Sequence, residues 1–73
     1  MEYITTVSYC FEHINSLAVD KIFKIIRGYA WGIKIEQESE RNYFSLYFNL
    51  DYYSPITKTV MRLVDEYHGD YSY

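Results

Sequence analysis

The sequence predicts a two-layer α+β domain in which two helices pack on one face of a three-stranded antiparallel sheet. Apolar and polar residues alternate in three segments and recur with helical spacing in two others, in the order strand, helix, strand, strand, helix. A crossover after the first strand, followed by a hairpin, places both helices on the same face of the sheet. A length of 73 residues corresponds to one domain, residues 1–73.

The first strand is expected from Tyr3 to Phe11, where the side chains alternate with a period of two. β-Branched and aromatic residues dominate this segment, as is typical of strands. The odd-numbered residues are expected to face the core: Tyr3, Thr5, Val7, Tyr9 and Phe11. The opposite face then carries Ile4, Thr6, Ser8 and Cys10.

Asn15 or Ser16 is expected to cap the start of the first helix, and with Asn15 as N-cap, Ile14 and Val19 take the positions of a hydrophobic staple. Gly28 is expected to end it, because glycine accepts the left-handed conformation found after many helices. The apolar residues of the helix gather on one broad side. They are Ala18, Val19, Ile22, Phe23, Ile25, Ile26 and Tyr29.

A hairpin is predicted next, with strands at 31–38 and 43–53 joined by a polar turn at 39–42. Pairing Glu38 with Tyr43 makes every inward residue meet another inward residue. The expected inward pairs are Ile35 with Leu46, Ile33 with Phe48, and Trp31 with Leu50. The same register places Lys34 across from Tyr47 on the other face.

The second helix is expected to start with Ser54 as N-cap and Pro55 in the first position, where a missing N–H costs nothing. Its apolar stripe is narrow, and Gly69 is expected to end it. The stripe consists of Ile56, Val60, Leu63, Val64 and Tyr67. Residues 70–73 are too short to be predicted as a strand, and we expect them to form a mobile tail.

The composition restricts the environment and the kind of partner. Cys10 is the only cysteine, which excludes an internal disulfide and favours a reducing compartment. The N-terminal residues lack a basic segment and an apolar signal core, and no apolar run is long enough to cross a bilayer. We therefore expect a soluble cytoplasmic protein without a membrane partner. The net charge of −3 disfavours non-specific nucleic-acid binding.

The residue types that carry chemistry do not form a recognisable set. Cys10 and His13 have a spacing seen at metal sites, but a zinc centre needs at least three protein ligands and only the distant His68 remains as a nitrogen donor. Glu36 and Glu38 share a face, yet the tip of a hairpin offers no cleft to shift their pKa values. We expect no metal, no cofactor and no catalytic residue, and hence a protein that is not an enzyme.

Ten of the 73 residues are tyrosine, more than a core of this size can hold. A two-layer fold leaves one sheet face uncovered, and the alternation places exposed tyrosines there. Tyrosine combines a large apolar ring with a polar tip, which suits binding surfaces. The predicted partner-binding residues on this face and the adjoining acidic hairpin are Tyr43, Tyr47, Lys34, Glu36 and Glu38.

These observations favour a small protein-binding module, an inhibitor or adaptor that occupies a partner surface, as small phage-encoded antagonists of host enzymes do. Two alternatives use the same face: stacking of single-stranded nucleic acid on the tyrosines, and self-association into a homodimer. Arg41 and Tyr43 are similar to the third-strand signature of the RNA-recognition fold, but Ser45 stands where a second stacking aromatic belongs. The chain is therefore not assigned to that fold.

Overall fold

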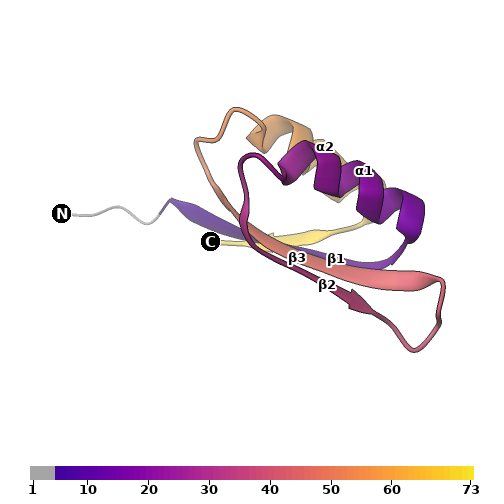
Figure 1. The fold of residues 1–73 in the computed structure, drawn as a ribbon. Helices are drawn as coiled ribbons and strands as arrows, with labels where there is room; N and C mark the ends of the chain where they lie inside the picture. Colours follow the sequence, from indigo (N-terminus) through magenta and orange to yellow (C-terminus); the bar gives the residue numbers. More distant parts are fainter. Residues whose placement is uncertain (1–4) are drawn as a thin grey trace.

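The computed structural model describes residues 5–73 as a single antiparallel sheet with both helices on one of its faces (Figure 1). The α+β class is confirmed, but the sheet has four strands in place of the predicted three, in the order β2-β3-β1-β4. The elements are β1 (Thr6–Asn15), α1 (Ser16–Ile26), β2 (Trp31–Gln37), β3 (Tyr43–Asp51), α2 (Thr57–Tyr67) and β4 (Asp70–Ser72).

Strand β1 lies inside the sheet between β3 and β4, and its odd-numbered residues face the core as predicted. Val7, Tyr9 and Phe11 are buried. The strand extends past the predicted end at Phe11, because a bulge at residues 12–13 lets it continue to Asn15. His13 adopts a left-handed φ of 56° in this bulge. The predicted inward Tyr3 and outward Ile4 lie outside the described residues.

Helix α1 begins where the capping pattern placed it. The Asn15 side chain accepts a hydrogen bond from the Ala18 N–H at 2.9 Å, which satisfies one of the free amides of the first turn. The helix ends at Ile26, and Arg27 forms its C-cap in a right-handed conformation. Gly28 follows in the turn without a left-handed φ, so the physical reason predicted for the helix end is wrong.

The hairpin has the predicted register over most of its length. Lys34 lies opposite Tyr47, Ile35 lies opposite Leu46, and the Glu38 N–H donates to the Tyr43 carbonyl at 2.9 Å. The predicted pairing of Trp31 with Leu50 is wrong. A register shift after Trp31, at the left-handed Gly32 (φ 64°), places Trp31 opposite Asn49 on the uncovered face.

Helix α2 starts later than predicted, at Thr57 with Ile56 as N-cap. Ser54 and Pro55 form a preceding turn, closed by a hydrogen bond from the Thr57 N–H to the Ser54 carbonyl at 3.1 Å. The left-handed residue that ends the helix is His68 (φ 55°), not Gly69. The apolar stripe is confirmed, because Val60, Leu63 and Val64 are buried and Ile56 and Tyr67 pack against them.

The last residues form β4 and are not a free tail. Strand β4 pairs antiparallel with β1, with Tyr71 opposite Tyr9 and Asp70 opposite Cys10. The chain turns beneath Phe11 to reach this position. A Cβ atom at Gly69 would lie 2.9 Å from the Phe11 ring, so the approach requires glycine.

The core lies between β1, β3 and the two helices, and it does not extend fully over β2. Ile22 and Ile26 of α1 are completely buried against this part of the sheet. Ile35 of β2 was predicted to lie under the helices, yet 46% of it is exposed. Strand β2 is therefore an outer strand that the helices only partly cover.

Candidate functional site

Within residues 5–73, no second layer covers the sheet face opposite the helices, and this face carries the predicted binding residues (Figure 1). Cross-strand partners point to the same side, so the register defines the members of this surface. We call it the open face. Its residues from the four strands include Ser8, Cys10, Lys34, Glu36, Ser45, Tyr47, Asn49, Asp70 and Ser72.

Three of the predicted site residues meet on the open face as the sequence indicated. Tyr47 lies opposite Lys34, and Lys34 Nζ lies 2.8 Å from Glu36 Oε1. The hydrogen bond to Glu36 and the negative charge of that carboxylate raise the pKa of Lys34. Both charged side chains remain at least half exposed. The result is a half-buried tyrosine bordered by an oriented pair of opposite charges.

Beside Tyr47, the open face contains a shallow hollow of about 360 Å³. Within it, the Ser8 hydroxyl donates to Asn49 Oδ1 at 2.8 Å. Its lining includes Ser8, Cys10, Gly32, Tyr47, Asn49 and Ser72. Burial and a hydrogen bond to Glu12 raise the pKa of the Cys10 thiol to about 11. The thiol is therefore protonated at neutral pH and is not an activated nucleophile.

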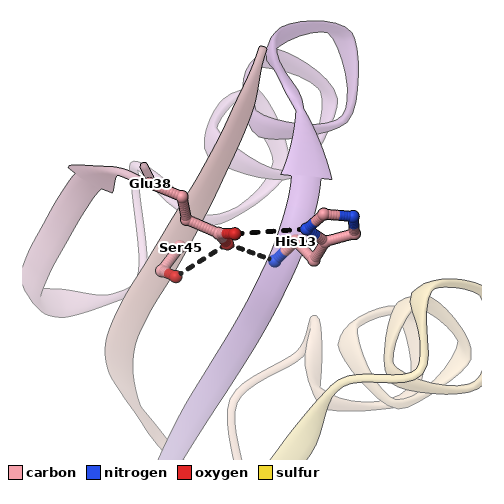
Figure 2. A network of polar contacts seen from close by, with 3 residues as sticks. All are labelled: His13, Glu38 and Ser45. Carbon is pink, nitrogen blue, oxygen red and sulfur yellow. Dashed lines mark hydrogen bonds and ion pairs between the residues drawn. The ribbon is translucent and has the colours of Figure 1, made fainter. Parts of the chain in front are cut away.

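The other two predicted site residues are engaged within the protein, in a network centred on Glu38 (Figure 2). Glu38 Oε2 accepts from the His13 N–H at 2.6 Å and from the Ser45 hydroxyl at 3.2 Å, while Oε1 lies 3.1 Å from His13 Nδ1. The His13 ring stacks on Tyr43 with a centroid separation of 3.9 Å. Glu38 and Tyr43 thus tie β2 and β3 to the β1 bulge.

The hydrogen bonds from the His13 side chain and backbone lower the pKa of Glu38. The carboxylate is therefore ionised at neutral pH and remains a constant acceptor for these donors. His13 was not among the predicted site residues. The structure shows why, because Phe11 and Ile14 are both buried and a regular strand cannot place residues three apart on one side, so the bulge that positions His13 appears only in the folded chain.

A second tyrosine surface, which the sequence did not indicate, lies where β4 meets α2. Tyr9 and Tyr71 rings are 6.2 Å apart, Tyr71 and Tyr73 6.0 Å, and Tyr73 and Tyr52 6.0 Å. These rings border a groove of about 420 Å³ that Lys58 and Arg62 of α2 also line. We call it the tyrosine groove. The ordering of β4, which the sequence did not predict, creates it.

Metal chemistry gains no support from the described part of the chain. Among residues 5–73, no three histidine, cysteine, aspartate or glutamate side chains gather closely enough to hold a metal ion. Cys10 and His13 diverge, since the thiol lies near Glu12 and the imidazole contacts Glu38. Within the same residues, neither helix is long and apolar enough to span a membrane.

Comparisons with protein-family models, with curated proteins and with solved structures found no match. The open face and the tyrosine groove therefore provide the basis for a functional inference. Both contain tyrosines next to polar or charged side chains, and Val7 and Met61 also line the groove.

Proposed function

We propose that this protein is a small, non-enzymatic protein-binding module that acts by occupying a partner surface with its open face. The observation that carries the proposal is the combination of Tyr47, the adjoining hollow and the Lys34–Glu36 pair. Tyrosine loses little conformational entropy on binding, while serine, asparagine and glycine adapt their hydrogen bonds to different partners. This composition is characteristic of surfaces that recognise proteins.

The internal engagement of Glu38 and Tyr43 changes their proposed role. They support the scaffold, and direct contact with a partner falls to Tyr47, Lys34 and Glu36. Because both charges are exposed and held at a fixed spacing, they suit a partner that presents the opposite charge pattern. A binding surface of this kind is sufficient for an inhibitor or adaptor, because such a protein acts by covering a surface of its partner.

Replacing Tyr47 with alanine is expected to weaken partner binding at least tenfold while leaving the melting temperature nearly unchanged. The measurement is a pull-down from nuclease-treated lysate of the source cells, followed by titration of the retained protein. Tyr29→Ala, in the turn after α1, is the matched control for loss of an exposed tyrosine. Equal retention by the wild type and Tyr47→Ala would contradict the proposal, as would a large loss of stability in Tyr47→Ala.

Single-stranded nucleic-acid binding is the second candidate. The tyrosine groove suits this function better than the open face does. Stacked bases need aromatic rings next to cations, and the groove provides Tyr52, Tyr71 and Tyr73 beside Lys58 and Arg62. Among the described residues, neither cation is in an ion pair. The same pull-down without nuclease distinguishes the two functions, because nucleic acid retained by Tyr47→Ala and lost in Tyr73→Ala would favour this candidate.

A further inference from the structure

The outer edge of β2 is the one long strand edge that stays free in the described part of the chain. The sheet ends at β2 on one side and at β4 on the other. Strand β4 has three residues, and very short edge strands are a common means of preventing further pairing. Strand β2 has seven residues, contains no proline, and is exposed over most of its length. It therefore offers a template for an additional strand.

The hydrogen-bonding pattern identifies which backbone groups of β2 face outward. The Glu38 N–H donates to Tyr43 of β3, and in an antiparallel pair the direction of these groups alternates along the strand. Glu36 and Lys34 therefore also turn their N–H and C=O groups toward β3. Ile35 and Gln37 present theirs to the free edge, so Ile35 stands at the middle of the available hydrogen-bonding sites.

The side chains around Ile35 are complementary to themselves. If a second copy of β2 pairs antiparallel about Ile35, Ile35 meets its own counterpart, Lys34 meets the second Glu36, and Glu36 meets the second Lys34. These charge pairs occupy positions that do not share ladder hydrogen bonds, where side chains lie closest. If residues 34 and 36 had the same charge, the two copies would repel each other. Because one is lysine and the other glutamate, each lies opposite a residue of opposite charge.

The helix side of the edge adds an apolar contribution. Ile35 is 46% exposed, and it borders a cleft of about 250 Å³ that Val19, Phe23 and Phe44 also line. Two-fold pairing about Ile35 brings the two clefts together and removes both Ile35 side chains from water. Such burial makes up a larger share of the stability of a small domain, because its own core contributes little.

We infer that two copies of this chain dimerise through antiparallel pairing of their β2 strands, centred on Ile35, to form one continuous eight-stranded sheet. Lys34 and Glu36 of the open face take part in this pairing, whereas the hollow beside Tyr47 and the tyrosine groove are lined by other residues. The inference does not depend on the proposed function, because its test measures association of the chain with itself. Symmetric dimers of this kind use one surface patch twice, which agrees with the self-complementary pattern.

The test is a charge reversal read out by sedimentation equilibrium over micromolar to millimolar concentrations. Lys34→Glu places glutamates opposite each other twice and should weaken dimerisation about tenfold or more. Adding Glu36→Lys restores both attractive pairs with the positions exchanged, and dimerisation should return. Both side chains are exposed, so circular dichroism should show the same folded monomer in all three proteins.

A disulfide trap tests the register separately, in a Cys10→Ser background. Chains carrying Lys34→Cys mixed with chains carrying Glu36→Cys should form a mixed disulfide faster than either chain alone, because residues 34 and 36 lie directly opposite only in this register. A wild-type chain that is monomeric throughout would overturn the inference. A dimer unaffected by Lys34→Glu, or one lacking the preferred mixed disulfide, would also overturn it.

Discussion

At the residue scale, the backbone conformation of His13 explains why Glu38 and Tyr43, two of the predicted binding residues, are engaged within the protein. The left-handed φ of His13 turns its N–H and its ring toward Glu38, which lies 25 positions later in the chain. Left-handed conformations cost free energy for residues other than glycine, so this geometry needs support from its surroundings. Glu38 provides that support by accepting a hydrogen bond from the His13 N–H and contacting the His13 ring, while the Ser45 hydroxyl of β3 donates to the same carboxylate.

Replacing Glu38 with glutamine is expected to lower the melting temperature near neutral pH, with a smaller difference in acid. The pKa of Glu38 is lowered in the folded state, so its carboxylate stabilises the fold above the ordinary glutamate pKa. That stabilisation disappears as the pH falls through the folded-state pKa. Melting temperatures of wild type and Glu38→Gln, recorded from about pH 7 to about pH 3, should therefore converge.

Glu36→Gln is the matched control for this prediction. It removes an exposed ion pair with Lys34, and such pairs contribute little to stability. At a protein concentration at which the chain is monomeric, its melting temperature should follow that of the wild type at every pH. A pH-independent difference for Glu38→Gln, or equal effects of the two substitutions, would show that the His13 network does not stabilise the fold.

At the element scale, the position of β4 depends on the tight turn that leads into it. His68 caps α2, the Gly69 N–H donates to the Val64 carbonyl at 2.9 Å, and the chain then passes under Phe11. Strand β4 is too short to be stable alone, so its pairing with β1 requires this close approach. The tyrosine groove consequently depends on Gly69 although Gly69 does not line it.

Gly69→Ala is expected to lower the free energy of unfolding by about 1–3 kcal/mol, the usual range for overpacking a core contact. The added methyl group would lie 2.9 Å from two Phe11 ring carbons and 3.1 Å from the Cys10 carbonyl oxygen. Urea denaturation measures the change, and amide exchange of Ser72, which lies opposite Ser8 in a hydrogen-bonded position, reports whether β4 detaches from β1. Gly28→Ala should have little effect, because a methyl group at that position would meet no other side chain or distant backbone atom within 4 Å. Similar urea denaturation curves for Gly69→Ala and Gly28→Ala would contradict the conclusion that close packing against Phe11 requires glycine at position 69.

At the scale of the whole molecule, one small core holds both layers together. The helices are also joined at the surface, where Lys21 Nζ lies 3.2 Å from Glu66 Oε2. A single core in a domain of this size rarely contributes more than about 3–5 kcal/mol of net stability. Loss of one central side chain is therefore expected to unfold much of the protein. Association through β2 would raise the free energy of unfolding as the protein concentration increases.

Leu46→Ala is expected to cost about 2–5 kcal/mol and to leave a large unfolded fraction at room temperature. Leu46 is fully buried in β3, at the centre of the core. Leu17→Ala is the matched control, because the Leu17 side chain on α1 is 79% exposed and should change stability by about 0.5 kcal/mol or less. Circular dichroism at fixed protein concentration compares them. A cooperative wild-type-like transition for Leu46→Ala would mean that the core lies elsewhere.

Part of the candidate site could be predicted from the sequence, and part could not. The juxtaposition of Tyr47 and Lys34 follows from a hairpin with a short turn, where neighbouring segments set their own register. The hydrogen bond from the His13 N–H to Glu38 joins two segments far apart in the chain, so the local pattern did not predict it. The tyrosine groove depends on the pairing of β1 with β4, which brings Tyr9 next to Tyr71.

The sequence by itself determined the fold class, the inward faces of β1 and β3, a helix start capped by Asn15 or Ser16, and the apolar stripe of α2, because side-chain periodicity and capping act over a few residues. Only the tertiary structure decided the fourth strand, the bulges at His13 and Gly32, and the partners of Glu38. Each of these rests on hydrogen bonds or close packing between distant segments, such as Gly69 beneath Phe11. The local sequence pattern does not predict such contacts, because they form only when the sheet assembles.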